Sequence, residues 1–395
     1  MAKYSSILDQ LLRHIPRGEF QQIVNRHQGD KGVRSFRCWK QFASLFFGQL
    51  TGQHSLRDLV TAVNTGLHKL RQVGLSHLSR STLADANESR PHEMYRELFG
   101  SLYERCRRTA PGHGFRFSHK VYCLDASVIS LSLKVFNWAQ FQAKKGAIKL
   151  HLALDLDGQI PSFCVITAGS QHEVKQARRQ RYEPDSILVF DRGYNDYHWF
   201  NDVDSQGVFF VTRLKRRASY KVVQRRKVDK GQGFTSDQTI RITGEKADCI
   251  PIDLRRVGYR DPETGQQYFF LTNVFHLSVE EIAALYKARW KIELFFKWIK
   301  QHLKIKSFLG TSPNAVMTQV WVALCVYLLT SYVRFLNRVA FTTYEVFKRL
   351  QVAALEYLPL AQVLQAPLRT RQGPKHDSVQ LRLWDSKTKA LFSTV

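Results

Sequence analysis

The stretch Tyr286-Lys-Ala-Arg-Trp-Lys-Ile-Glu-Leu-Phe-Phe-Lys-Trp-Ile-Lys300 decides how the rest of this sequence is interpreted. It follows Ser278, which stands three residues before Glu281, a spacing that predicts a helix start with a capping box. No glycine or proline interrupts the chain from there to about residue 303. We therefore expect one uninterrupted helix.

Two neighbouring faces of this predicted helix differ in character. At about 100° per residue, one arc of about 60° is polar and extends for about 20 Å. It carries a phenol, a guanidinium, a carboxylate and an ammonium: Tyr286, Arg289, Glu293 and Lys300. The adjacent arc is apolar and predicts contact with a core through Leu285, Ile292, Phe296, Ile299 and Leu303.

The polar arc has two interpretations. It fits a solvated face, on which isolated ion pairs stabilise little. It also fits a metal-dependent phosphoryl-transfer site, where a carboxylate binds the cation and basic neighbours bind phosphates. Which of the two holds depends on whether further acids lie upstream.

The spacing Tyr-x2-Arg-x3-Glu-x6-Lys resembles the tyrosine-arginine-glutamate-lysine signature of the IS4 family of DDE transposases. The resemblance implies that Glu293 is the third of three catalytic acids and a metal ligand. It also implies that Tyr286, Arg289 and Lys300 contact DNA near the scissile bond, and Lys297 is a further expected DNA contact.

Two upstream aspartates stand at the ends of apolar runs. Residues 120–127 predict a short strand that carries Asp125, and residues 186–190 predict a buried strand followed by Asp191. The sequence Asp191-Arg192-Gly193-Tyr194 resembles the family motif around the second aspartate, and Arg192 is a weaker candidate for DNA contact. The resemblance therefore extends over about residues 121–300.

The order of predicted elements indicates an α/β fold with an RNase H-like core. Residues 148–156 alternate and turn at Asp157-Gly158 into a second strand of a hairpin. Three antiparallel strands, a helix and a fourth strand follow the RNase H plan, in which Asp125 and Asp191 lie side by side and Glu293 on a later helix completes the set. Asp155 and Glu173 are the alternative acids.

Three carboxylates suit two-metal chemistry. Two Mg²⁺ ions about 3.5–4 Å apart can activate the attacking oxygen and stabilise the leaving one. Mg²⁺ takes hard oxygen ligands and keeps some water. We expect Asp125, Asp191 and Glu293 to bind Mg²⁺, and Mn²⁺ to be able to replace it.

Composition points to a nucleic-acid partner. The chain has 59 Lys and Arg against 33 Asp and Glu, a formal net charge of +26, which favours a large polyanion such as double-stranded DNA. Six scattered cysteines without a CxxC pair predict buried free thiols in a reducing compartment. The N-terminus does not resemble a secretory signal, and the apolar run of residues 320–329 is too short to span a bilayer. We expect a bacterial cytoplasmic protein without a membrane role.

The chain divides into five predicted regions. Residues 1–115 predict a helical N-terminal DNA-binding domain, in which a helix-turn-helix would present Arg80, Ser81, Thr82 and Asn87 to a DNA end. An ordinary α-hairpin explains the same stretch. The other regions are core residues 116–206, a β-rich insertion at 207–275, core residues 276–340, and a C-terminal helical region with a basic tail at 341–395.

The predicted insertion carries two cationic clusters, residues 215–217 and 225–227. Phosphate contact and a charged, solvated strand edge both explain them. Relatives that cut through a DNA hairpin stack a flipped base on a tryptophan in this insertion. Here no tryptophan lies between Trp199 and Trp290, so the hairpin step stays open.

The resemblance implies an enzyme that binds the ends of an insertion sequence, cleaves them by metal-dependent hydrolysis and joins the 3′-OH ends to target DNA. We expect a homodimer in a synaptic complex. Two alternatives stay open: a nuclease of the same fold without strand transfer, and a catalytically inactive DNA-binding descendant. The intact set of acids argues against the second.

Overall fold

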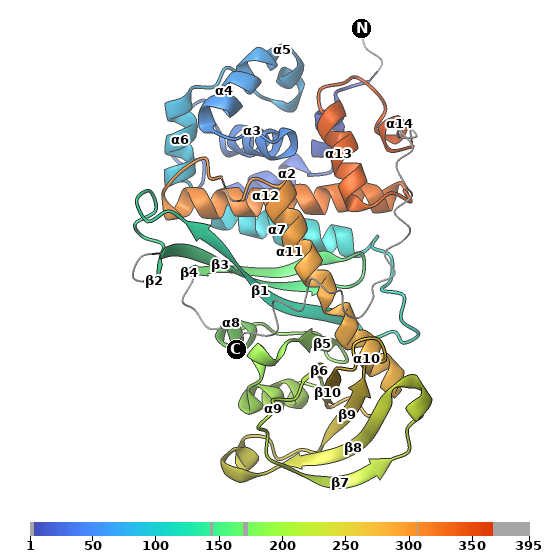
Figure 1. Ribbon diagram of the computed structural model, residues 1–395. Helices are drawn as coiled ribbons and strands as arrows, with labels where there is room; N and C mark the ends of the chain where they lie inside the picture. The colour runs from blue at the N-terminus through green and yellow to red at the C-terminus, as the bar shows by residue number, and fades with distance from the viewer. Residues whose placement is uncertain (1–3, 143–144, 169–172, 306, 366–395) are drawn as a thin grey trace. The chain divides into compact units, whose positions relative to one another are not determined.

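The computed structural model describes residues 4–142, 145–168, 173–305 and 307–365 (Figure 1). These residues form a mixed α/β structure that divides into two compact units. Unit 1 holds the described residues of 1–114, 125–172 and 292–366, and unit 2 holds 115–124 and 173–291.

The N-terminal part of unit 1 is helical, as predicted. Serine side chains cap three of the helices, because Ser6, Ser55 and Ser79 each accept a hydrogen bond from a backbone N–H of the first turn. The elements are α1 (Ile7–Leu12), α2 (Arg17–Arg26), α3 (Cys38–Thr51), α4 (Leu56–Thr65), α5 (Leu67–Leu70), η1 (Arg71–Val73), α6 (Arg80–Ser89) and α7 (Glu93–Arg107).

Helix α12 (Pro313–Leu336) is the central helix of unit 1. It packs against α3, α6, α7 and strand β4 (Ile160–Ala168), between the N-terminal helices and the strands in Figure 1. By length and composition it could cross a membrane, yet 89% of its most apolar window is buried inside the protein. It is followed by α13 (Thr343–Ala353) and α14 (Leu360–Gln365), which lie in the predicted C-terminal helical region.

A hairpin forms the strand layer of unit 1. Strand β3 (Lys145–Asp155) pairs antiparallel with β4 and also borders β1 (Val121–Leu131) and the short β2 (Gln140–Gln142). The predicted turn at Asp157-Gly158 is confirmed. Gly158 has φ 66°, and a Cβ there would lie 2.6 Å from the Phe335 ring, so only glycine fits.

Unit 2 is built on a sheet in the order β1-β5-β6-β10-β9-β8-β7. The first four residues of β1 belong to this unit, and β1, β5 and β6 run parallel, whereas the remaining neighbours pair antiparallel. The strands are β5 (Ile187–Phe190), β6 (Phe209–Arg213), β7 (Tyr220–Arg226), β8 (Phe234–Ile242), β9 (Leu254–Arg260) and β10 (Gln267–Thr272).

Strands β6 to β10 lie within the predicted β-rich region, residues 207–275, and η4 (Gly244–Cys249) lies between β8 and β9. The other helical elements of unit 2 are α8 (Glu173–Ala177), η2 (Arg192–Tyr194), α9 (Tyr197–Ser205), η3 (Lys230–Gln232) and α10 (Val279–Ala288).

Helices α9 and α10 cover opposite faces of the unit 2 sheet. Phe200 of α9 stacks on Phe210 with ring centroids 4.4 Å apart. Tyr286 of α10 packs on Phe270 at 5.1 Å, and Phe270 is in register with Arg213. Phe210 and Arg213 are three residues apart on β6, so alternation turns them to opposite faces.

The long helix expected from residue 278 is divided in two. The capping box of Ser278 and Glu281 is confirmed and starts α10, but α10 ends at Ala288 and α11 (Trp290–His302) follows. Arg289 between them keeps a right-handed helical backbone, and its N–H bonds to the Tyr286 carbonyl in a tightened turn. The expectation of one uninterrupted helix was wrong at this residue.

The cysteines are free thiols, and five of the six are buried, as predicted. Cys249 in η4 is only half-buried. Burial raises the pKa of the Cys38 thiol to about 12. Such thiols stay protonated at neutral pH and pack as small apolar groups.

A buried ion pair holds the distal strands of unit 2 to the chain that enters α10. Arg255 on β9 donates through Nε and Nη2 to both oxygens of Asp237 on β8, each at 2.9 Å. Its Nη1 donates to the Leu277 carbonyl at 2.6 Å. Both side chains are about 5% exposed, so removal of either would leave a buried charge.

We predict that Asp237→Leu lowers the free energy of unfolding by about 3–5 kcal/mol, because Arg255 stays buried without its carboxylate. The matched control is Asp253→Leu, which breaks the exposed pair with Arg241 and is expected to cost at most about 1 kcal/mol. Urea unfolding followed by circular dichroism measures both. Equal losses in the two variants would contradict the prediction.

His151 is a buried titratable group in the hairpin of unit 1. It lies on β3 with 3% of its surface exposed, and Nε2 is 2.9 Å from the Thr167 hydroxyl. Burial, with a smaller contribution from Lys149, lowers the pKa of His151 to about 4. The folded state therefore holds the neutral imidazole down to acidic pH, whereas the unfolded chain binds a proton near pH 6.5.

We predict that this imidazole makes unit 1 acid-sensitive. Because the folded pKa is the lower one, its stabilisation is complete above about pH 6.5 and is lost as the pH falls toward 4, by roughly 3 kcal/mol in total. Melting curves at pH 7.5 and 5 should show a smaller drop for His151→Leu than for the wild type. His198→Leu, at an exposed position, is the control and should keep the full drop.

Candidate active site

The register between β1 and β5 gives the first two predicted acids equivalent places on neighbouring strands. Leu124 pairs with Phe190 across the parallel strands. Asp125 and Asp191 are the next residues along the two strands, and both are half-buried. The pairing thus brings together two chain segments that are 66 residues apart.

The residues two positions before the aspartates are paired on one face of the strands. Cys123 precedes Asp125 and Val189 precedes Asp191, and Cys123 pairs with Val189. The Cys123 Sγ lies 3.6 Å from the carbonyl oxygen of Ala288 in α10. Cys123 and Val189 therefore belong to the face of the strands that α10 covers.

A tight loop orients the carboxylate of Asp191. The Gly193 N–H donates to Asp191 Oδ1 at 2.8 Å, and Asn195 Nδ2 fixes the loop by donating to the Arg213 carbonyl at 2.8 Å. A Cβ on Gly193 would lie 2.9 Å from Asp191 Oδ1 and 3.6 Å from Glu173 Oε2. Glycine is therefore needed beside Asp191, and Glu173 is a second carboxylate at this loop.

Lys300 contacts the strand that carries Asp125. Its Nζ donates to the Ser127 hydroxyl at 2.6 Å and to the Val128 carbonyl at 2.9 Å. Asp125 itself accepts a hydrogen bond at Oδ1 from the Ala126 N–H at 2.8 Å. The predicted DNA contact Lys300 is thus bonded to β1 just beyond the first acid.

Helix α11 carries part of each arc expected on the helix, because Tyr286 and Arg289 lie before its first residue. The apolar arc is buried and includes Ile292, Phe296 and Ile299. Glu293 is half-buried, whereas Lys297 is exposed to solvent. Of the cations predicted on α11, Lys297 is therefore the one on the open surface.

Tyr286 and Arg289 are buried, at 7% and 8% exposure. Burial raises the pKa of the Tyr286 phenol, which keeps it neutral. Opposing contributions come from Arg289 and from Arg213, which hydrogen-bonds to Tyr286, while Asp191 is close enough to act on the phenol electrostatically. The Arg289 guanidinium lies 5.7 Å from the Tyr286 ring centroid and 5.9 Å from that of Trp290. Within unit 2, Tyr286 therefore lies close to Asp191.

Two residues of this site were missed from the sequence. Arg213, at the end of β6, lies over the Tyr268 ring at 4.8 Å and reaches Tyr286. Ser127 receives Lys300. No spacing or motif marks either one. Arg213 is the last residue of β6, and Ser127 was the last residue of the strand predicted over 120–127, although β1 continues to Leu131.

The acids suit a hard divalent cation. Among the residues that the structure describes, no three His, Cys, Asp or Glu side chains form a cluster that could hold a metal ion. Asp125 and Asp191 offer one carboxylate each. Mg²⁺ is usually bound by one or two carboxylates together with water and phosphate oxygens, so this donor set fits it.

Asp155, an alternative acid, has a structural role. It is fully buried, its Oδ2 accepts from the Tyr103 hydroxyl at 3.0 Å, and its Oδ1 accepts from the Asp157 N–H at 2.9 Å. Both oxygens are therefore used to hold the β3–β4 turn against α7. This leaves Glu173 as the alternative acid with a place at the site.

The predicted DNA contacts of the N-terminal helices differ in their exposure to solvent. Arg80 and Thr82 are exposed in the first turn of α6, where Ser79 accepts from the Thr82 N–H at 3.1 Å. Asn87 is only 3% exposed, and its Oδ1 accepts from Gln41 Nε2 at 2.9 Å. Its amide is used in packing α6 on α3, so the expected reading of a base by Asn87 does not fit this structure.

The two cationic clusters of the β-rich segment differ in exposure. Residues 215–217 are all exposed between β6 and β7. In the second cluster Arg225 and Lys227 are exposed, whereas Arg226 turns inward to Thr239 and Asp237. One of the six cations is therefore structural, and the other five remain on the surface.

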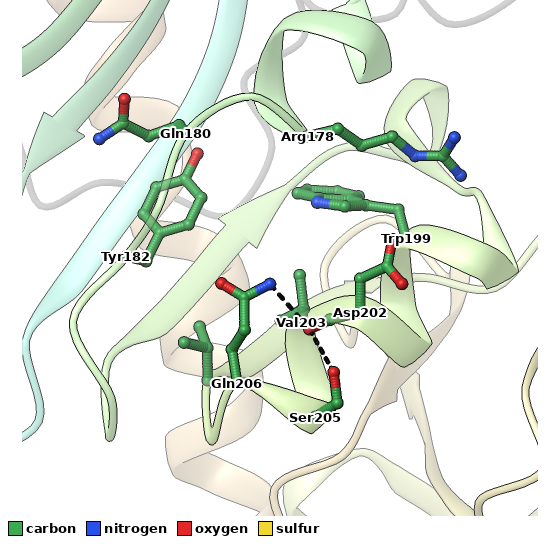
Figure 2. Close-up of a pocket in the computed structure, with 9 residues that line it drawn as sticks. Arg178, Gln180, Tyr182, Trp199, Asp202, Val203, Ser205 and Gln206 are labelled. Carbon is green, nitrogen blue, oxygen red and sulfur yellow. Dashed lines mark hydrogen bonds between the residues drawn. The ribbon is translucent and has the colours of Figure 1, made fainter.

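A pocket of about 210 Å³ lies in unit 2 beside α9 (Figure 2). In Figure 2 the side chains of Ser205 and Gln206 both donate to the Asp202 carbonyl. The pocket is separate from the predicted acids, since its lining consists of Arg178, Gln180, Tyr182, Trp199, Asp202, Val203, Ser205, Gln206 and Val208.

Two parts of the chain match known protein-family models. Residues 116–329 match the family model described as a transposase DDE domain, and residues 3–76 match one described as a domain of unknown function. The first match spans both predicted aspartates, Glu293 and Lys300.

The chain is also similar to three curated proteins. It is 36% identical to a putative transposase, y4zB, of Sinorhizobium fredii, over 70% of this chain and 80% of the relative. It is 27% identical to a probable transposase for insertion sequence element IS5377 of Geobacillus stearothermophilus, over 65% and 67%. It is 25% identical to a putative transposase for insertion sequence element IS4SA of Synechocystis, over 63% and 70%.

Among solved structures, the chain is similar to the piggyBac transposase in a synaptic complex with hairpin DNA. The TM-score is 0.46 at 11% identity, over 94% of this chain and 84% of the other.

Proposed function

The chain belongs to the DDE transposases, and we propose that Asp125, Asp191 and Glu293 are the three acids of its active site. As a member of this family with IS4-like relatives, it is a DNA transposase, an enzyme that cleaves DNA and transfers strands. The family uses divalent metal ions. We assign Mg²⁺ to this site, with Mn²⁺ as a substitute, because the donors are hard carboxylate oxygens.

The pairing of Leu124 with Phe190 carries this proposal. It pairs the residues that directly precede Asp125 and Asp191 on two parallel strands, which supports a shared metal site. Glu293 supports the set because it lies on α11 two helical turns before Lys300, which bonds to β1 two residues beyond Asp125.

We propose further that these strands form an RNase H-like core. The strand order β4-β3-β1-β5-β6 supports it, with β3 and β4 antiparallel and β1, β5 and β6 parallel. In this proposal the antiparallel strands β7 to β10 are the insertion between the second and third acids.

The residues of the proposed site divide into groups with different roles in the reaction. When bound, two divalent ions supply activation of the attacking oxygen and stabilisation of the leaving one. The three carboxylates would hold them, and the Gly193 N–H keeps Asp191 in one orientation. Buried Tyr286 and Arg289 shape the wall beside Asp191, and Arg192 and exposed Lys297 would bind DNA phosphates.

The enzyme binds DNA, and the basic surfaces suggest where. A formal net charge of +26 favours contact with many phosphates. Arg80 and Thr82 at the N-terminus of α6 and the cations of residues 215–217 are exposed and suited to the DNA backbone. We propose that the helices of unit 1 hold the element's end, and that Asn87 supports α6 from inside.

A homodimer in a synaptic complex belongs to the same proposal, because two ends of one element must be joined to one target. Residues 366–395 of the predicted basic tail lie outside the described residues. We place the reaction in the bacterial cytoplasm, where chromosomal DNA lies. A nuclease without strand transfer and an inactive descendant explain the family membership less well.

We predict that Asp125→Asn, Asp191→Asn and Glu293→Gln each bind the terminal DNA of the encoding element and lose Mg²⁺-dependent cleavage. Removal of a group that acts in the transition state costs about 10²- to 10³-fold. A gel assay with labelled duplex measures cleavage, and the exposed Glu263→Gln variant is the control. Cleavage at the wild-type rate by Glu293→Gln would overturn the assignment. DNA with pre-cut ends tests strand transfer, and joining of these ends to target DNA would exclude a simple nuclease.

We also predict that Gly193→Ala lowers cleavage by about 10²-fold without unfolding the protein. The new Cβ would meet Asp191 Oδ1 at 2.9 Å and force the carboxylate to move. Gly100→Ala, where no atom lies within 4 Å, is the matched control. The prediction fails if Gly193→Ala and Gly100→Ala cleave equally well and melt at the same temperature.

A further inference from the structure

Helix α11 is anchored in unit 1 at its C-terminal end. Gln319 of α12, 2% exposed, donates to the carbonyls of Lys304 and Ser307 and accepts from the Leu309 N–H at 2.7 Å. The Lys304 N–H donates to Gln49 Oε1 of α3 at 2.8 Å. The chain that leaves α11 is therefore fixed to α12 and α3, two helices of unit 1.

Lys300 supplies a second anchor, toward the strand. It stands in the last turns of α11, and its Nζ donates to Ser127 Oγ at 2.6 Å and to the Val128 carbonyl at 2.9 Å. An ammonium has three donors and no acceptor, so these two bonds fix it between a side chain and a backbone oxygen. Charge-assisted bonds of this kind are among the stronger hydrogen bonds in proteins.

The periodicities of helix and strand make this anchor specific. Ser127 is two residues after Asp125, so the two side chains share a face of β1. Lys300 is seven residues after Glu293, so the two side chains share a face of α11, about 10.5 Å apart along its axis. The bond from Lys300 to Ser127 therefore turns the Glu293 face of α11 toward the Asp125 face of β1.

We propose that Lys300 is a positioning residue, which sets Glu293 relative to Asp125 through Ser127 and the Val128 carbonyl. Its amine acts through the two elements that carry the first and third acids. Because it concerns these acids, the proposal rests on the proposed function. It differs from a phosphate contact by Lys300, the role expected from the sequence.

The two roles predict different measurements. A lysine that binds phosphate adds to DNA affinity, and its loss lowers the slope of log affinity against log salt by about one. A lysine that positions Glu293 leaves affinity and salt slope unchanged but lowers the rate of the bound complex. A misplacement of about 1 Å can cost about 10²-fold in rate.

The test compares Lys300→Met, Ser127→Ala and the double variant on duplex DNA that carries the terminal sequence of the encoding element. We expect Lys300→Met to cleave about 10²-fold more slowly at saturating DNA with unchanged salt slope. Ser127→Ala should cleave more slowly in the wild-type background and have no further effect on Lys300→Met, because both changes break the same contact. Lys297→Met, at the exposed lysine of the same helix, is the comparison and should lose one unit of salt slope.

A lower salt slope for Lys300→Met, or a full additional effect of Ser127→Ala in the double variant, would overturn the proposal. Melting temperatures identify a variant that fails to fold, and Ser127→Ala then decides alone: a wild-type cleavage rate overturns the positioning role. The acid assignment is tested separately by the single variant Glu293→Gln, which keeps Lys300. Cleavage at the wild-type rate by that variant would overturn the acid assignment.

Discussion

The parallel pairing of β1 with β5 is the constraint on which the proposed chemistry depends. Backbone hydrogen bonds fix Leu124 against Phe190, and covalent geometry then fixes the residue that follows each of them. Cys123 and Val189, two residues before the acids, are paired on the face covered by α10. No direct interaction between the two aspartates is needed to place them, which suits like charges that repel each other until cations bind between them.

The surroundings of these strands make the arrangement rigid where it has to be. The loop after Asp191 is closed by the Gly193 N–H and tied to β6 through Asn195, so the carboxylate has a fixed orientation. Buried Arg255 and Asp237 hold the strands beyond to the chain that enters α10. The flexible long side chains that remain exposed, such as Lys297, are the ones suited to a mobile phosphate backbone.

Several features of the fold could be predicted from the sequence, because they depend on residues that are neighbours along the chain. The capping box at Ser278, the turn at Gly158 and the helical N-terminal region are decided by local hydrogen bonding and backbone preference. The break at Arg289 could not be predicted from the sequence, because arginine itself favours a helix. Its buried guanidinium packs beside Tyr286 and Trp290 only in the folded chain. The packing role of Asn87 could not be predicted either, because its partner Gln41 is 46 residues away in the sequence.

By itself, the sequence determined the reaction class through its resemblance to the IS4 family: the Tyr-Arg-Glu-Lys spacing and the motif around Asp191 each lie within a short stretch of the chain. The tertiary structure decided how those residues are used. Strand register paired the residues that precede the two aspartates, burial made Tyr286 a packing residue, and a contact across 173 residues bonded Lys300 to Ser127. Such partners are set by long-range packing, and periodicity within one helix reports only which face a residue occupies, never what that face meets.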